Sequence, residues 1–269
     1  MGTYVAKTEH RREFVRELLS RLGVAEQVRK ARRILVKPNI VSHELYPTTT
    51  HPEVLSACLE VLIQWHKEIV VADGPAIDAG NSEDILNQHP LKKVCDSFAI
   101  PVIDLTSEEM TTIVTQSGME LEVTKMVFDY DFIVSLPVLK SHGICFFTGA
   151  LKNQFGFFST KERVRLHLGK DILRAIAEVN AVIKPSLFIV DAVETLIKTN
   201  ERRHGGIPIK LGYMLGGTDP LSLDAFGLQL LGQLDLKLRG KSFQDIPYLA
   251  YAAKLAIGDP QAQPLQIQV

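Results

Sequence analysis

Short runs rich in apolar residues alternate along this chain with longer stretches whose apolar residues recur at helical spacing. The apolar runs lie at 34–36, 69–72, 101–105, 132–136, 187–190 and 213–217. The amphipathic stretches lie at 10–22, 52–65, 82–98, 161–183, 220–231 and 243–257. Short continuous apolar runs are typical of buried strands in parallel sheets. Strands that alternate with helices predict an α/β fold with a mainly parallel sheet flanked by helices.

One part of the pattern differs from this alternation. Residues 111–116 and 119–125 alternate polar with apolar side chains on either side of Ser117-Gly118. This is typical of a β-hairpin, so we expect an antiparallel hairpin as an addition to the fold. The sequence has no linker rich in Gly, Ser or Pro and no internal repeat. We therefore predict a single α/β domain over residues 1–269, with 258–269 as a loose C-terminal tail.

Charge and cysteine usage limit the classes of partner. The chain has 30 Lys and Arg residues against 31 Asp and Glu residues, a formal net charge of −1. This balance predicts neither a nucleic-acid partner nor a membrane surface. The N-terminus lacks an apolar signal region and no run of apolar residues is long enough to span a bilayer, so we expect a cytoplasmic location. Cys58, Cys95 and Cys145 form no C-x-x-C motif, which predicts unpaired thiols and no iron–sulfur cluster.

Polar side chains follow most of the predicted strands. The carboxyl ends of parallel strands meet at one edge of a sheet, where ligands bind in open α/β folds. The residues expected to face a crevice at that edge are Lys37, Asp73, Lys140, His142, Asp191 and Asp219. Each also has a structural interpretation: Asp219 could cap the next helix, Asp73 could form a turn, and the lysines and His142 could be ordinary surface residues.

The segment 137–158 (PVLKSHGICFFTGALKNQFGFF) carries the greatest density of polar residues among aromatic ones. Its polar members include Lys140, His142, Thr148, Lys152 and Asn153. Aromatic surroundings lower the dielectric and strengthen the pairing of a lysine with an anion. If the segment folds back, Lys140 and Lys152 can approach one oxyanion. The alternative is a buried amphipathic helix whose lysines extend outward to solvent.

The stretch Tyr46-Pro47-Thr48-Thr49-Thr50-His51-Pro52 precedes a predicted helix and suits an oxyanion or a phosphate. Hydroxyl groups and free N–H groups at a helix N-terminus suit an oxyanion. The alternative is that Thr50 simply caps a helix that starts at Pro52. No phosphate-binding loop, nucleophile elbow, zinc-protease motif or dinucleotide fingerprint is present.

Seven segments in this order resemble the domain-of-unknown-function family 362 over about residues 33–232: ILVKPNIVS, TTTHPEVL, VVADGP, FIVSLPVLKSH, TGALKNQFGF, FIVDAVE and LGGTDPLSLDAFG. Many relatives are described as iron–sulfur proteins because they carry an added ferredoxin module with C-x2-C-x2-C-x3-C spacing, which this sequence lacks. The motif positions that the resemblance marks are Lys37, Asn39, Thr50, His51, Asp73, Lys140, His142, Thr148, Lys152, Asn153, Asp191, Asp219 and Asp224.

Our first hypothesis is an enzyme that acts on a small anionic metabolite, a carboxylate or a phosphate. Lys37, Lys140 and Lys152 would hold the anion, and His142 would be the general acid or base because its reference pKa is nearest neutrality. Asp73 or Asp191 would orient His142 or hold a cation. The remaining ligand-binding candidates are Asn39, Thr50, His51, Thr148, Asn153 and Asp219, with Thr50 and Asn153 as hydrogen-bond donors.

The ferredoxin-fused relatives add the expectation of a redox step shared with a separate electron carrier. Two alternatives stay open. One is a non-catalytic module that binds an anion or docks a redox partner. The other is a divalent-metal site formed by His51 or His142 with Asp73, Asp191 and Asp219. The sequence specifies no cofactor, substrate or reaction.

Overall fold

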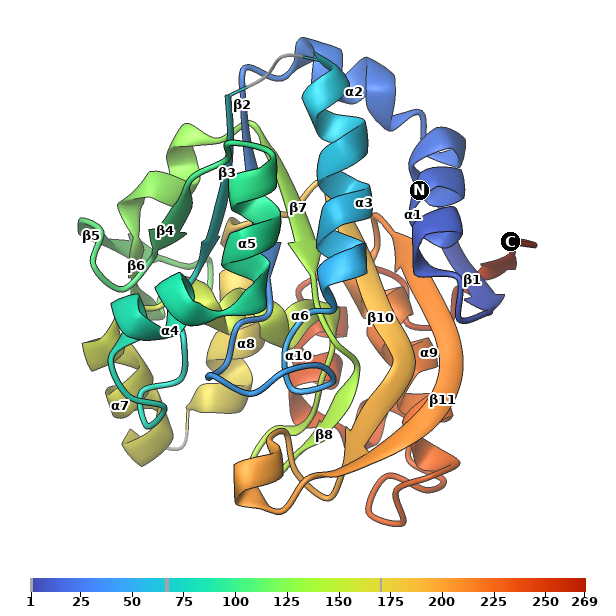
Figure 1. Cartoon of the computed structure of the whole chain (residues 1–269). Coiled ribbons are helices and arrows are strands. Elements are labelled where there is room, and N and C mark those ends of the chain that lie inside the picture. The colour runs from blue at the N-terminus through green and yellow to red at the C-terminus, as the bar shows by residue number, and fades with distance from the viewer. Residues whose placement is uncertain (1, 66–67, 170) are drawn as a thin grey trace.

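The computed structural model describes residues 2–65, 68–169 and 171–269. Its main sheet has eight strands in the order β12-β1-β11-β10-β7-β2-β3-β4 (Figure 1). Their bounds are Leu265–Gln266 (β12), Thr3–Lys7 (β1), Ile207–Gly217 (β11), Leu187–Ile197 (β10), Phe132–Leu136 (β7), Arg33–Pro38 (β2), Glu68–Asp73 (β3) and Val102–Asp104 (β4). Neighbours pair in parallel except at β11, which is antiparallel to both β1 and β10. The predicted α/β class with a mainly parallel sheet is confirmed.

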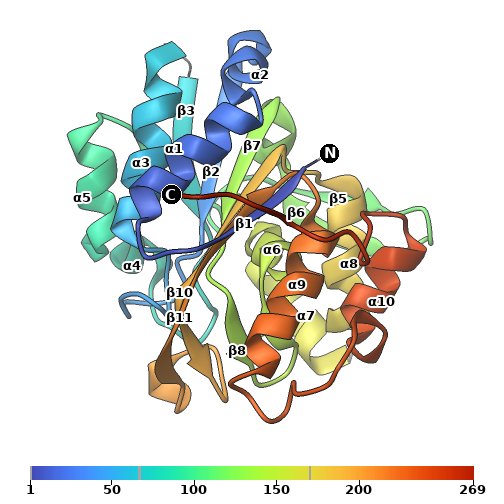
Figure 2. The ribbon, with the colours of Figure 1, turned by 90° about the vertical axis from the view of Figure 1, so that its right-hand side faces the viewer.

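Helices cover both faces of this sheet (Figure 2). One face carries Arg11–Arg21 (α1), Val24–Lys30 (α2), Pro52–Leu62 (α3), Ser82–Gln88 (α4) and Pro90–Ser97 (α5). The other carries Ala150–Asn153 (α6), Thr160–Gly169 (α7), Ile172–Val182 (α8), Pro220–Gly232 (α9) and Pro247–Lys254 (α10). Side chains along β2 alternate between the faces: Ile34 and Val36 join the core under α1 to α5, and Leu35 joins the core under α6 to α10.

Two antiparallel hairpins lie outside the main sheet. The predicted hairpin is confirmed as Met110–Val114 (β5) paired with Glu120–Thr124 (β6). The other, Lys140–His142 (β8) with Phe146–Thr148 (β9), falls inside the polar and aromatic segment 137–158. That segment is therefore not one buried helix. Short 3₁₀ helices occur at Ile63–Trp65, Lys125–Asp129, Gln154–Phe157, Arg202–His204 and Phe243–Asp245.

Three predicted elements differ from the structure. The stretch 161–183 forms two helices, α7 and α8, rather than one. The run at 213–217 is the end of the antiparallel strand β11, so its carboxyl end lies beside the start of β10. The tail 258–269 is not loose, because β12 pairs with β1 and Ile267 is buried. Local patterns could not show the last two features, since strand direction and edge pairing are set by non-local hydrogen bonds.

Candidate anion-binding pocket

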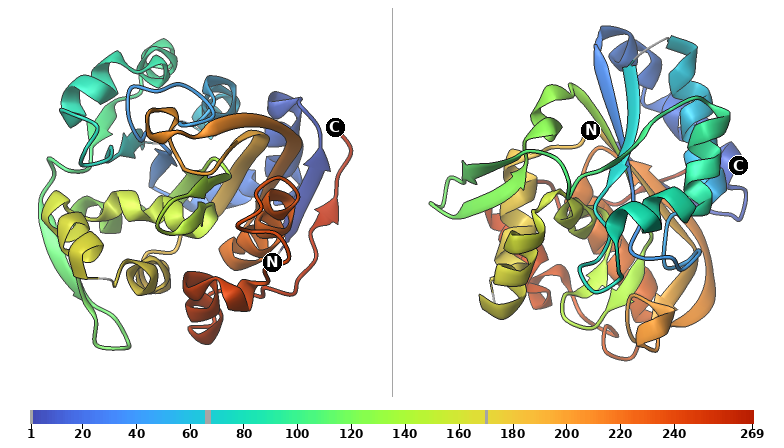
Figure 3. Two further views of the ribbon diagram at one scale, coloured as in Figure 1. Left: turned by 90° about the horizontal axis from the view of Figure 1, so that it is seen from below. Right: turned by 60° about the vertical axis from the view of Figure 1, so that its left-hand side comes forward.

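A cavity of about 410 Å³ lies where β2 and β3 end and where β8 begins. Figure 3 (left) shows this side of the molecule, with the loop after β2 beside the loop between β10 and β11. Those loops are joined by a hydrogen bond of 2.8 Å from Arg202 N to Glu44 Oε2. The predicted site residues that line the cavity are Lys37, Asn39, Asp73, Lys140, His142, Thr148, Lys152 and Asn153. A cavity of this size is in the range of small-molecule sites.

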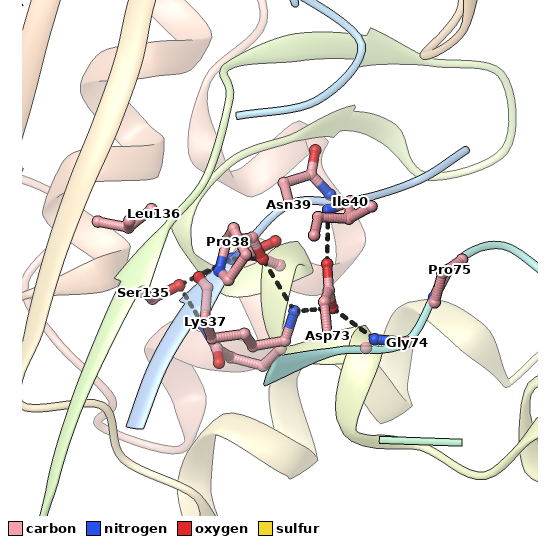
Figure 4. Close-up of polar contacts among 12 residues, drawn as sticks. Lys37, Pro38, Asn39, Ile40, Asp73, Gly74, Pro75, Ser135 and Leu136 are labelled. Atoms are coloured by element: carbon pink, nitrogen blue, oxygen red, sulfur yellow. Dashed lines mark hydrogen bonds and ion pairs between the residues drawn. The ribbon is translucent and has the colours of Figure 1, made fainter. Parts of the chain in front are cut away.

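An ion pair between Lys37 and Asp73 forms one wall (Figure 4). Lys37 leaves the end of β2, Asp73 leaves the end of β3, and both side chains are buried. Asp73 also accepts hydrogen bonds from Ile40 N at 2.6 Å and Gly74 N at 2.8 Å. A Cβ at Gly156 would lie 2.6 Å from Lys37 Nζ, so only glycine lets the backbone pass this pair. Burial lowers the pKa of Lys37, and Asp73 opposes that change.

Three further cations reach the cavity without contacting a carboxylate in the described part of the chain: Lys140, Lys152 and Arg163. Lys140 is only 1% exposed, and its ammonium donates to the carbonyl of Thr48. Burial lowers the pKa of Lys140 to about 7, and the charge of Lys152 adds to this lowering. Lys140 therefore loses its proton more easily than an ordinary lysine.

Lys152 and Arg163 complete the positive surface of the cavity. The Lys152 ammonium lies 4.0 Å from the ring centroid of Phe155, and burial lowers its pKa. Arg163 donates to the carbonyls of Pro75 and Gly156, each at 2.7 Å, and burial lowers its pKa to about 10. No sequence pattern indicates Arg163 as a site residue, because it lies within an ordinary amphipathic stretch and reaches the cavity only through the packing of α7.

His142 has a different arrangement from the one expected of a general base. Its Nδ1 accepts hydrogen bonds from Ile144 N at 3.1 Å and Cys145 N at 3.2 Å. That pattern assigns the ring proton to Nε2. Burial lowers the pKa of His142 well below its ordinary value, and Lys152 and Lys140 add to the effect. The ring is thus neutral, and Nε2–H is a hydrogen-bond donor.

Two acceptor oxygens of the cavity lining have no hydrogen-bond partner among the described residues: Asn39 Oδ1 and Asn153 Oδ1, both buried. The Asn153 amide nitrogen already donates to Ser135 Oγ at 2.9 Å. The Asn153 amide nitrogen, which we expected to donate to a ligand, is therefore engaged within the protein.

Thr50 and His51 lie outside the cavity lining and have structural contacts. Thr50 Oγ1 accepts from Asn39 N at 2.7 Å and donates to Leu136 O at 2.6 Å, which ties the loop after β2 to β7. His51, rather than Thr50, caps α3 by accepting from Glu53 N at 3.2 Å.

Asp191 and Asp219 also lie outside the cavity lining. Asp191 is buried and accepts from Arg11 Nε and from the Tyr46 hydroxyl, each at 2.7 Å. Asp219 caps α9 by accepting from Ser222 N at 2.9 Å and holds Asp259 N at 2.8 Å. The expectation that Asp219 faces the crevice is wrong because β11 runs antiparallel to β10. Capping, its alternative interpretation, matches the geometry.

The structure does not assemble the ligands of the metal hypothesis. His51, Asp191 and Asp219 do not line the cavity with His142 and Asp73. Residues 2–65, 68–169 and 171–269 contain no group of three His, Cys, Asp or Glu side chains placed to hold an ion. Cys58, Cys95 and Cys145 are buried free thiols.

Comparison with known proteins gives a family and a fold. The family model described as "Domain of unknown function (DUF362)" matches residues 34–229. A thylakoid-associated protein of Synechocystis sp. is 28% identical over 229 residues, which cover 82% of this chain and 70% of that protein. In the described part of the chain, no helix combines the length and the apolar character needed to cross a membrane.

Two solved structures match this chain, and the first of them has a similar fold. The lactate racemase apoprotein from Thermoanaerobacterium thermosaccharolyticum has a TM-score of 0.54 and 14% identity over 82% of this chain. The chain spans 55% of that protein's length. A protein from Thermotoga maritima has a TM-score of 0.41 and 17% identity, with 73% of this chain and 53% of that one covered.

Proposed function

The chain belongs to the DUF362 family, a domain family of unknown function, and from its pocket we propose that it is an enzyme that binds a small carboxylate or phosphate and moves a proton on it. The observation that carries this proposal is the convergence of Lys140, Lys152 and Arg163 on one cavity without a contacting carboxylate in the described residues. Buried charge is costly unless it is paired. An anionic ligand would supply the missing partner.

Lys37 contributes differently from the other three cations. Its charge is already matched by Asp73, so the pair supports the wall of the pocket and adds little net attraction for an anion. Glu201, the other buried carboxylate of the lining, pairs with Arg203 at 2.7 Å. The net positive charge that an anion meets therefore comes from Lys140, Lys152 and Arg163.

Proton transfer is assigned to Lys140. A group whose pKa lies near the working pH can both give and accept a proton, which suits general acid–base catalysis. His142 would donate its Nε2–H to a ligand oxygen and stabilise charge that develops there. A module that only binds an anion, the runner-up function, would need the positive charge but not a lysine with this pKa.

Calorimetric titration tests the binding half of the proposal. Sulfate, phosphate, lactate and propionate are the probes, and lactate is included because the similar fold belongs to a lactate racemase. We expect Lys152→Met to weaken binding by about ten- to a hundredfold, since a charge-assisted hydrogen bond contributes roughly 1.5–3 kcal/mol. The exposed Lys161 gives the matched control, and Lys161→Met should bind like wild type. Equal affinities in all three proteins, or no binding of any probe, would overturn the proposal.

Deuterium exchange tests the catalytic half. Lactate and enolisable 2-oxo acids would be incubated with the protein in D₂O and followed by NMR. We expect exchange at a carbon-bound proton of at least one of these anions, with loss of the exchange in Lys140→Met. Binding of the anions without any exchange would contradict the enzyme and favour the binding module.

A further inference from the structure

Four residues of the pocket lining have exposures that are the reverse of those on an ordinary protein surface. Charged residues are usually exposed and isoleucine is usually buried. Here Lys140 and Arg163 are 1% and 3% exposed, whereas the lining residues Ile77 and Ile144 are 43% and 59% exposed. Lys140 and Arg163 therefore lie deep in the cavity, and Ile77 and Ile144 lie where it meets solvent, together with the exposed lining residues Asp78 and His204.

This apolar mouth is built from the loops around it. Ile77 lies in the loop after β3, where Ala76 N donates to Val41 O at 2.8 Å. Ile144 lies in the turn between β8 and β9, and its own N–H donates to His142 Nδ1 at 3.1 Å. Ile40, Val41 and Phe155 continue the apolar lining toward the interior. Both isoleucines thus belong to segments that are fixed by hydrogen bonds.

Resting on the proposed function, we propose that the ligand is amphipathic: its carboxylate or phosphate contacts the deep cations, and an alkyl or acyl tail contacts Ile77 and Ile144. A compact ion such as phosphate would leave these isoleucines in water. The cavity volume of about 410 Å³ is in the range that accommodates drug-sized ligands, which are larger than lactate. A tail would cover the exposed apolar surface and gain the favourable transfer of each methylene from water.

A chain-length series tests this inference. Acetate, butyrate and hexanoate would be titrated calorimetrically. Sulfate, which has no alkyl tail, would measure binding to Lys140, Lys152 and Arg163 alone. We expect affinity to rise by up to about fourfold for each added methylene that becomes buried. Hexanamide, which keeps the tail and lacks the charge, should bind much more weakly than hexanoate.

Variants locate the effect in the pocket. Ile77→Ser and Ile144→Ser should lower the ratio of hexanoate to acetate affinity severalfold. Ile63→Ser provides the matched control, because Ile63 is an exposed isoleucine at 37% that does not line the cavity. Thermal melts would show that each variant is folded.

The outcomes separate the two proposals. If sulfate and acetate bind but the affinity does not depend on chain length, the tail inference fails and the proposed function stands. The tail inference also fails if hexanamide binds as well as hexanoate. It fails likewise if Ile63→Ser lowers the ratio of hexanoate to acetate affinity as much as Ile77→Ser and Ile144→Ser do. If no anion binds at all, the proposed function itself fails.

Discussion

Lys37 and Lys140 are chemically identical residues near the ends of neighbouring strands, yet the structure gives them different roles. Both are buried to the same extent. Lys37 contacts Asp73, whereas Lys140 donates to the carbonyl of Thr48. The contacting carboxylate offsets the cost of burying the charge on Lys37. Lys140 has no such partner among the described residues, so we expect a bound anion to favour its protonated form.

Anion binding should therefore take up protons. In the free protein the pKa of Lys140 is about 7, below its ordinary value of 10.5. A bound anion favours the charged form and raises this pKa. Near pH 8 most free protein has a neutral Lys140, so binding of sulfate should add a fraction of a proton, and affinity should fall as pH rises through 7 and above. Sulfate itself does not titrate in this range.

Calorimetry in two buffers with different ionisation enthalpies measures this uptake. Lys140→Met should abolish it, and Lys161→Met should leave it unchanged. Sulfate binding at pH 8 without proton uptake by wild type would show that Lys140 is not the titrating group.

At the scale of elements, the pocket depends on a helix too short to be stable alone. α6 spans four residues and carries Lys152 and Asn153. Isolated helices of this length do not form in water. Its first turn is held by Asp224 of α9, which accepts from Ala150 N at 2.6 Å and Leu151 N at 3.0 Å. Burial raises the pKa of Asp224 to about 7, while these two hydrogen bonds oppose the rise.

Asp224→Ala should lower the free energy of unfolding by about 3 kcal/mol, because it leaves two buried N–H groups without an acceptor. It should also weaken sulfate binding, since Lys152 loses its support. A carboxyl with a raised folded-state pKa contributes stability below its unfolded pKa and loses it as pH rises toward 7. The difference in free energy of unfolding between wild type and Asp224→Ala should therefore be larger at pH 5 than at pH 8.

Urea denaturation at both pH values checks this prediction, with Asp171→Ala as the control because Asp171 is exposed. A change below about 0.5 kcal/mol in Asp224→Ala, the size of an ordinary surface substitution, would contradict it.

At the scale of the whole molecule, the C-terminal segment completes the edge of the sheet. β12 pairs in parallel with β1, and Ile267 N donates to Val5 O at 2.9 Å. Ile267 is 5% exposed and packs in the core under α1 to α5, whereas Leu265 is 60% exposed. The two ends of the described chain therefore stabilise each other.

Ile267→Ala should lower the free energy of unfolding by about 2 kcal/mol, since it removes buried methyl and methylene groups from a packed core. Leu265→Ala should change it by less than about 0.5 kcal/mol. Chemical denaturation of the two variants beside wild type is the measurement. If both variants lowered the free energy of unfolding by the same small amount, residues 258–269 would behave as the loose tail that the sequence predicts.

The order of strands and helices could be predicted from the sequence, because apolar periodicity is local and is set by burial on one or two faces. The same local pattern predicted that Lys37 and Asp73 lie together at one edge of the sheet, and both line the cavity. Lys37 and Asp73 follow strands that run parallel in neighbouring positions, so their convergence follows from the strand pattern.

Only the tertiary structure decided the rest, because it depends on contacts between residues far apart in the chain. Because β11 is antiparallel, Asp219 does not line the cavity, and the packing of α7 places Arg163 in its lining. Asp191 pairs with Arg11, which lies 180 residues away in the sequence. Two backbone N–H groups donate to His142 and determine which ring nitrogen carries its proton. Residue types alone show neither the ion-pair partner nor the position of the proton. Periodicity determines which face a residue occupies, whereas partner and protonation state are determined by the neighbours that folding brings to it.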